Sequence, residues 1–279
     1  MVLNQFKTVV LLGLMTALLL WVGQLLGGIS GLYIAGAFAI IMNFGSYWFS
    51  DKIVLKMYRA KEVKDTEHRL HKIVKEVVEL AKVPMPKVYI MPSDNPNAFA
   101  TGRNPKHAAV ATTQGILNLL NDEELKGVMA HEMAHVKNRD ILISTIAGTI
   151  AGVISYVAFM ARWAAIFGGR DRDSGNMASM LVLAIITPLI AMIIQLAISR
   201  SREYLADATG ANMLKNPDGL ASALAKLEQG VKTHPMKLGN NATAHMFIAN
   251  PFRAGGIMKL LSTHPPMQTR INKLKSLKF

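Results

Sequence analysis

The sequence contains no cysteine, which restricts both its possible cross-links and its possible metal sites. Without thiols the chain can form no disulfide, and a zinc ion would have to be held by histidine nitrogen and carboxylate oxygen. Ligand sets of this kind are typical of catalytic zinc sites, whereas finger-type structural sites use thiolates. The lack of cysteine therefore favours a catalytic over a structural metal, if the chain holds one.

Charged residues are missing from four long apolar stretches. These stretches are 8–26, 29–49, 141–161 and 177–198. Each reaches the roughly 20 residues that a helix needs to cross the hydrocarbon core of a bilayer. The first stretch is longer than the core of a signal peptide and is followed closely by the second, so residues 1–50 are interpreted as an uncleaved hairpin. A second hairpin is predicted over 141–198, which gives four transmembrane helices.

Lysine and arginine gather beside the first predicted hairpin, where the segment 51–75 contains eight of them. Basic segments next to membrane helices stay in the cytoplasm. An even number of crossings then brings 51–140 and 199–279 to the same side, and both termini are predicted to be cytoplasmic. The net charge of +13 thus lies next to a membrane and favours anionic lipid headgroups as a partner. No basic helix interleaved with stacking aromatics appears, so nucleic acid is not expected.

The two cytoplasmic segments are predicted to form one small domain with a short sheet. Residues 87–91 and 108–112 have the composition of strands. Asn121 is followed three residues later by Glu124, the spacing of a capping box at the start of a helix. No breaker separates this helix from Ile141, so it is expected to continue into the third apolar stretch.

The predicted helix carries the sequence His131-Glu132-Met133-Ala134-His135. Histidines four residues apart lie on one face of a helix, where both can bind one zinc ion. A glutamate directly after the first histidine is suited to act as a general base beside that ion. The motif therefore predicts a zinc-dependent hydrolase, although the same pattern also arises by chance on a solvated helix.

A catalytic zinc needs one further protein ligand, and Glu203 is the best candidate. It lies shortly after the fourth apolar stretch, as His135 lies shortly before the third, so antiparallel crossings would bring both to the same membrane edge. Asp207 lies four residues later on the same helical face and is predicted to fix the tautomer of a ligating histidine. The simpler alternative is that Glu203 and Asp207 only solvate a helix beside the membrane.

These two motifs, with two apolar stretches between them, resemble the HtpX family of bacterial membrane zinc metalloproteases, which are relatives of the CAAX-processing Ste24 proteases. The resemblance covers nearly the whole chain. It implies one zinc per subunit, bound by His131, His135 and Glu203, with Glu132 as base. It also suggests His264 and Arg270 as stabilisers of the reaction's oxyanion. In the family an edge strand beside the active site can bind an extended substrate. The candidate residues for that strand are Asn97, Ala98, Phe99, Ala100, Thr101 and Gly102.

The resemblance implies a mainly α-helical polytopic protein of the bacterial cytoplasmic (inner) membrane, with a small α+β zincin-like domain on the cytoplasmic side. Its expected substrates are misfolded or damaged membrane proteins, with a role in stress response that overlaps that of the ATP-dependent protease FtsH. No phosphate-binding Gly-x-x-x-x-Gly-Lys loop is present, so no ATP site of its own is expected.

Three alternatives compete with this prediction. An intramembrane metalloprotease would also use the histidine motif, and Asn216-Pro217-Asp218-Gly219 is superficially similar to its second aspartate motif. The charges around the histidines argue against burial in a bilayer, and helix capping suffices to explain Asp218. A metal transporter would need ionisable residues within the crossings, and the four stretches have no acidic or basic residue. A zinc-binding sensor or scaffold without proteolysis remains open.

Overall fold

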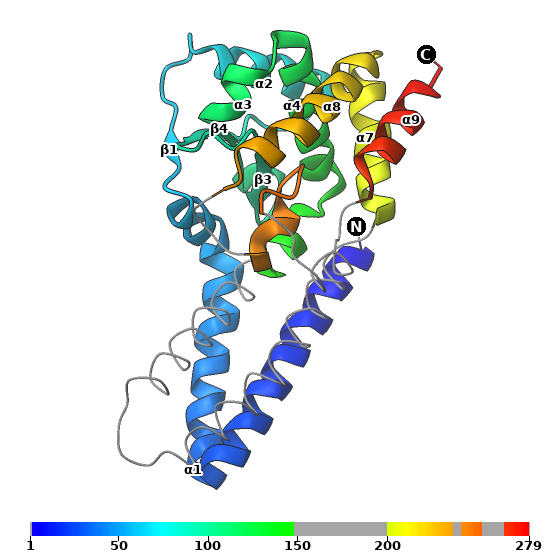
Figure 1. Ribbon diagram of the computed structural model, residues 1–279. Coiled ribbons are helices and arrows are strands. Elements are labelled where there is room, and N and C mark those ends of the chain that lie inside the picture. The colour runs from blue at the N-terminus through cyan, green and yellow to red at the C-terminus, as the bar shows by residue number, and fades with distance from the viewer. Residues whose placement is uncertain (1, 148–199, 237–240, 253–264, 279) are drawn as a thin grey trace.

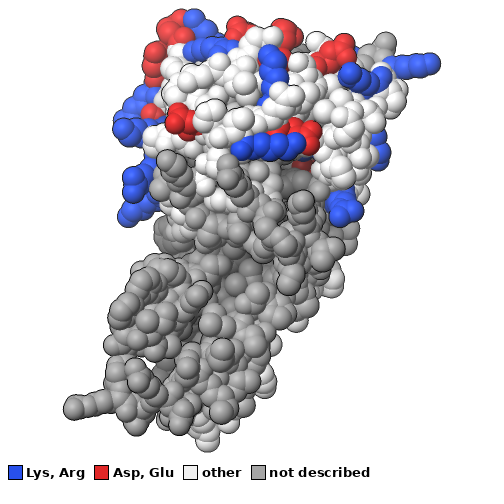
Figure 2. All heavy atoms as spheres, viewed as in Figure 1, with Lys and Arg blue, Asp and Glu red and all other residues white. Residues whose placement is uncertain are grey.

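A computed structural model describes residues 2–147, 200–236, 241–252 and 265–278 (Figure 1). A long helical hairpin extends away from a domain that contains a sheet and several helices. Most of the third apolar stretch, all of the fourth, and His264 lie outside the described residues. On the face shown in Figure 2, acidic and basic side chains gather on the domain.

Helix α1 (Val2–Met57) forms the hairpin, with its two arms joined at Gly28. Gly28 has φ 56°, a left-handed conformation that glycine adopts without steric cost. This turn lies between the first two predicted crossings. The second arm continues to Met57, beyond the boundary predicted at residue 50. Its helix Gly28–Met57 is, among the described residues, the one that is both long and apolar enough to span a membrane, so the four crossings stay a prediction.

Contacts between the arms explain why α1 folds back on itself. A Cβ atom added to Gly31 would lie only 2.1 Å from the carbonyl oxygen of Gly23, so the two backbones touch where side chains are absent. Farther from the turn, Asn43 Nδ2 donates a hydrogen bond of 2.8 Å to Thr16 Oγ1. Small residues and a polar pair of this kind are typical of helix packing in membranes.

Four strands form one mixed sheet in the order β1-β2-β4-β3. They are β1 (Lys61–Glu62), β2 (Lys87–Met91), β3 (Ala98–Gly102) and β4 (Ala108–Thr113). Strands β2 and β4 are parallel, whereas β1 and β3 run antiparallel to their neighbours. The strands predicted over 87–91 and 108–112 are therefore confirmed. Strand β3 lies at the edge of the sheet.

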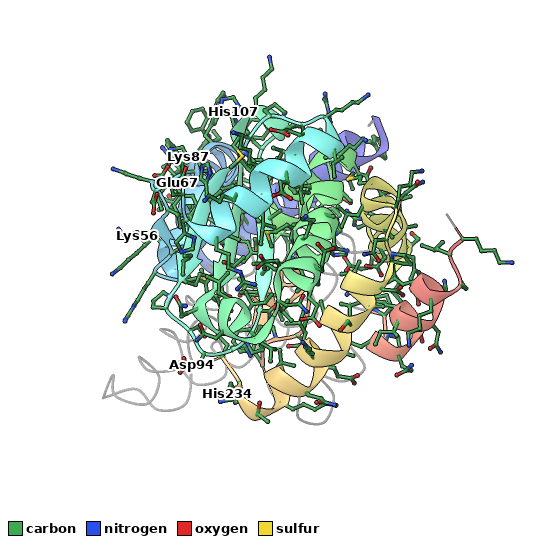
Figure 3. The ribbon with its side chains drawn as sticks, turned by 90° about the horizontal axis from the view of Figure 1, so that it is seen from above. Lys56, Glu67, Lys87, Asp94, His107 and His234 are labelled. Atoms are coloured by element: carbon green, nitrogen blue, oxygen red, sulfur yellow. The ribbon has the colours of Figure 1, made fainter. Side chains whose placement is uncertain are left out.

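The helices of the domain pack around α4. They are α2 (Arg69–Ala81), α3 (Gln114–Leu119), α4 (Asp122–Asn138), α7 (Arg200–Leu214), α8 (Asp218–Thr233) and α9 (Met267–Lys275), with 3₁₀ turns η1 (Pro105–His107) and η2 (Asn241–Met246). Helix α4 contacts α2, α7, α8 and β3, and it is buried along most of its length. Seen from above, the helices follow one another across the domain from α2 through α4 and α8 to α9 (Figure 3).

Two helix boundaries differ from the sequence-based expectation. Helix α4 does not continue into the third apolar stretch, because Arg139 adopts a left-handed conformation with φ 57° and ends it at Asn138. Asp218 is not a cap either. It is the first residue of α8, and its own backbone N–H donates to Asn216 Oδ1. Asp218 is also absent from the group of candidate metal ligands among the described residues, so the likeness of Asn216 to Gly219 to a second aspartate motif no longer supports the intramembrane alternative.

The start of α4 is fixed by the predicted capping box. The Asn121 side chain accepts from the backbone N–H of Glu124, and the Glu124 side chain accepts from that of Asn121. The buried Glu124 carboxylate also accepts 2.6 Å and 2.8 Å bonds from Ser222 Oγ and Lys226 Nζ of α8. Burial alone would raise the pKa of Glu124, but these bonds outweigh it and lower the pKa below 4.5.

We expect Glu124→Ala to lower the free energy of unfolding by about 2 kcal/mol, because it removes a helix cap and a charged bond between helices. Since folding depresses this pKa, the contribution is present above pH 4.5 and is lost as the pH falls through the folded value. Denaturant unfolding at pH 7 and pH 3 checks both statements. The exposed neighbour Glu123 gives the control, and an equal effect of Glu123→Ala would contradict the assignment.

Candidate metal centre

Helix α4 places the two histidines of the motif side by side. Their Nε2 atoms are 3.1 Å apart, and the two rings are perpendicular. Helix α7 approaches this turn of α4 at Gly210, where an added Cβ would lie 2.9 Å from the backbone nitrogen of His131. A glycine at this position allows the close contact that brings the acidic residues of α7 to the histidines.

Glu203 of α7 completes a group of three candidate ligands. Its carboxylate oxygens are 3.8 Å from His131 Nε2 and 3.6 Å from His135 Nε2. The ligand atoms of the three residues all lie within 4.8 Å of one another. Ligands at about 2.1 Å from a tetrahedral zinc ion are roughly 3.4 Å apart. The separations seen here therefore fit such an ion closely.

Two carboxylates fix the orientation of the histidine rings. Asp207 Oδ1 is 2.9 Å from His131 Nδ1, which is the contact predicted from the sequence, and Asp140 Oδ2 is 3.2 Å from His135 Nδ1. A carboxylate beside Nδ1 keeps the proton on that atom, so the lone pair lies on Nε2. Both Nε2 atoms then face the same small space, where one metal ion could bind to both of them.

The charge of the site also favours a cation. Burial alone would lower the pKa of His135, but the carboxylates of Asp140, Glu203 and Glu132 outweigh burial and raise it to about 10. The same carboxylates attract a metal ion, which competes with the proton for Nε2. The donor set of two imidazoles and one carboxylate, without thiolate, is one that catalytic zinc uses.

Glu132 lies beside the three candidate ligands without belonging to their group. Its side chain is buried, and it accepts a hydrogen bond from the backbone N–H of Ala100 in β3. Burial raises the pKa of Glu132, which makes its carboxylate a stronger base. Glu132 and the ligands line a cavity of about 30 Å³, which has room for water but not for a peptide.

Arg270 of α9 does not reach the cavity as an oxyanion donor, which corrects the expectation from the sequence. Its side chain is fully buried, and its Nε and Nη2 donate bonds of 2.8 Å and 2.7 Å to Asp207. Nη1 donates to the carbonyl oxygen of Ile248 and lies 3.7 Å from Glu203 Oε2. Arg270 therefore positions the carboxylates of Asp207 and Glu203 without lining the cavity itself. Burial alone would raise the pKa of Asp207, but Arg270 and His131 lower it to about 2.

The predicted substrate strand, Asn97 to Gly102, contributes β3 and reaches the site at Ala100. All five residues of β3 are buried. The carbonyl oxygen of Ala98 already accepts a bond of 3.1 Å from Ile248 N, and the Asn97 side chain bonds both backbone groups of Ala249. Part of the outer edge of β3 is thus occupied by the chain's own segment 248–249. Substrate binding along this strand stays a prediction.

Two residues at the site were missed by sequence reasoning. Asp140 escaped notice because α4 was expected to continue past Arg139, which would have turned Asp140 away from His135. His245 lines the cavity, and its Nε2 donates to the carbonyl oxygen of Ser144 over 3.0 Å. No spacing in the sequence connects His245 with the motif 110 residues earlier, so no local signal could have found it.

We expect Asp140→Asn to weaken zinc binding by about 10- to 100-fold, because the ring of His135 loses the acceptor that orients it. Competition with a chromophoric chelator measures this affinity. Asp94 is an exposed aspartate on the rim of the domain and provides the matched control Asp94→Asn (Figure 3). Equal zinc affinities for the wild type and Asp140→Asn would contradict the role given to Asp140.

Comparisons with known proteins identify chains that are similar to this one. The model of Peptidase family M48 matches residues 64–278. A "Protease HtpX homolog" of Desulforapulum autotrophicum is 56% identical over 277 residues, covering 98% of this chain and 89% of the relative. A protein of the same name from Syntrophotalea carbinolica is also 56% identical and covers 98% and 99%. One from Pyrococcus furiosus is 51% identical and covers 97% and 95%.

Among solved structures, the crystal structure of Ste24p from S. mikatae is similar, with a TM-score of 0.51. The sequences are 17% identical, so this likeness concerns the fold alone. The alignment covers 98% of the present chain and 66% of that longer one.

Proposed function

The chain belongs to Peptidase family M48 and is a metalloprotease, and we propose that it is a zinc-dependent endopeptidase that cuts misfolded or damaged membrane proteins in their cytoplasmic parts. One observation carries the proposal. His131, His135 and Glu203 lie within 4.8 Å of one another, with the buried carboxylate of Glu132 beside them. This combination provides both a metal site and a base.

Each residue of the site has a defined task in this proposal. His131, His135 and Glu203 would hold the zinc ion, which supplies Lewis-acid activation of a water and of the scissile carbonyl when it is bound. Glu132 takes a proton from the attacking water and passes it to the leaving amine. Asp207 and Asp140 keep the histidine protons on Nδ1, and Arg270 balances the buried charge of Asp207.

The proposed location is the bacterial inner membrane, with several crossings and with the site and both termini in the cytoplasm. Support comes from the apolar helix Gly28–Met57 and from the basic residues that follow it. The metal site lies in the domain that joins this helix. Residues 141–147, which continue the chain from the site, begin the third predicted crossing.

The proposed substrates are unfolded segments, because only an extended chain could pair with the edge strand β3 beside the cavity, which is too small to admit a folded protein. A functional overlap with FtsH is proposed from the resemblance to the HtpX family. Both proteins would act on damaged membrane proteins, and the present chain would do so without ATP.

Removal of the metal is the direct test of the proposal. We expect the purified full-length protein to lose cleavage of an unfolded substrate after treatment with a chelator, and to recover it when one equivalent of zinc per chain is added. Bound metal is counted in parallel by elemental analysis. Binding of zinc without cleavage of any unfolded or membrane substrate would instead support the sensor or scaffold.

A further inference from the structure

We propose that the connection between β3 and β4, residues 103–107, forms a binding site for the phosphate headgroups of anionic phospholipids. Residues of the connection line two surface hollows of about 420 Å³ and 490 Å³. Both hollows are lined by its basic residues. The proposal depends on the membrane location given above and is independent of proteolysis.

The first hollow combines cations with aromatic rings at the end of α1. The Arg103 guanidinium stacks on the ring of Trp48 at 4.4 Å, and Lys52 Nζ lies 5.5 Å from the ring centre of Phe49. Both rings are more than 40% exposed. Asp51 is the one acidic residue in the described lining, and His107 adds a further polar group. Exposed tryptophan beside basic side chains is typical of the headgroup level of a membrane.

The second hollow is more strongly basic. Its cations come from the ends of α2 and α4 and from η1, and they are Lys82, Lys106, Lys137 and Arg139. No acidic residue belongs to its described lining. Three lysines and an arginine thus line one hollow, and anionic lipids attract clusters of basic residues with about 1 kcal/mol per residue.

Both hollows lie where apolar segments end. Lys52 follows Trp48 near the end of the helix Gly28–Met57, and Arg139 comes two residues before Ile141, where the third predicted crossing begins. Charged groups at these two positions would meet the same layer of headgroups. Figure 3 places His107 at the rim of the domain, on the side opposite Asp94 and His234, so the connection is accessible. A lipid is favoured over a soluble anion because it satisfies the cations and the rings together.

The test compares lipid retention by the purified full-length protein and by Arg103→Gln/Lys106→Gln. Native mass spectrometry counts phosphatidylglycerol and phosphatidylcholine that stay bound after detergent exchange. We expect the wild type to prefer phosphatidylglycerol and the double variant to bind it about 30-fold more weakly, because two cations are lost. The matched control is Lys275→Gln/Lys278→Gln, which removes two exposed charges at the C-terminal end of the domain.

Four outcomes would overturn the proposal. The first is equal retention of the two lipids by the wild type, and the second is an equal loss in the control, which would make the effect one of net charge. The third is displacement of the lipid by inorganic phosphate, which would indicate a site for free anions. The fourth is displacement by an acidic peptide, which would assign the surface to substrate capture. Because no substrate is cleaved in the assay, failure here leaves the peptidase proposal untouched. Unchanged zinc content and melting temperature show that each variant is folded.

Discussion

Glu132→Gln is expected to lower the rate of peptide cleavage by about a thousandfold or more while zinc stays bound. The amide has the shape of the carboxylate but cannot take a proton, and loss of a general base costs about 10² to 10⁴ in rate. Zinc is retained because Glu132 lies outside the group formed by His131, His135 and Glu203. Turnover of an unfolded substrate and elemental analysis of the same sample measure the two quantities.

The control for this variant is Glu123→Gln, which changes an exposed glutamate near the start of the same helix. It should retain full activity. Two results would contradict the assignment of Glu132 as base. One is activity of Glu132→Gln within tenfold of the wild type, and the other is loss of zinc from the variant, which would make Glu132 a ligand.

Arg270→Met is expected to destabilise the metal-free protein by about 3–5 kcal/mol, because removing one partner of a buried ion pair leaves an uncompensated charge. The guanidinium is fully buried and makes two short bonds to Asp207. It also lies 3.7 Å from the Glu203 carboxylate. Denaturant unfolding in detergent, with and without zinc, measures the loss. The loss should shrink when zinc is bound, since the metal then balances Glu203.

A double-mutant cycle separates charge from packing in this prediction. Asp207→Asn combined with Arg270→Met leaves neither charge unpaired, so the double variant should be more stable than the sum of the single effects predicts. Lys275→Met alters an exposed residue of the same helix and should have little effect. Additive effects of the two single variants would show that the Arg270–Asp207 pair is not coupled.

The parts of the site that follow from local rules could be predicted from the sequence. The four-residue spacing of His131 and His135 places both on one face of a helix whatever surrounds it. The capping box between Asn121 and Glu124 likewise depends on four consecutive residues. Glu203 required one assumption about topology, and the structure brings it to within 4 Å of both histidines.

The sequence could not predict those parts of the site that depend on the backbone conformation of single residues or on contacts between distant segments. A left-handed arginine at position 139 has no sequence signature, and without it Asp140 would not reach His135. The environment of Arg270 depends on how α9 packs against α7, 63 residues away along the chain. The resemblance suggested that Arg270 belongs to the site. It predicted contact with the reacting atoms, whereas in the structure Arg270 contacts the carboxylates of Asp207 and Glu203.

Because α4 ends before Arg139, the three candidate ligands are held in place by two different parts of the chain. Asp140, which opens the helical stretch 141–147, holds His135 twice, through its own N–H to the carbonyl oxygen and through its carboxylate to the ring. His131 and Glu203 are instead braced by Asp207 and Arg270 within the domain. A bound ion would therefore link the domain to the helical stretch 141–147, with which the third predicted crossing begins. Any tilt of residues 141–147 would move Asp140 and His135, and it would thereby change the coordination of the ion.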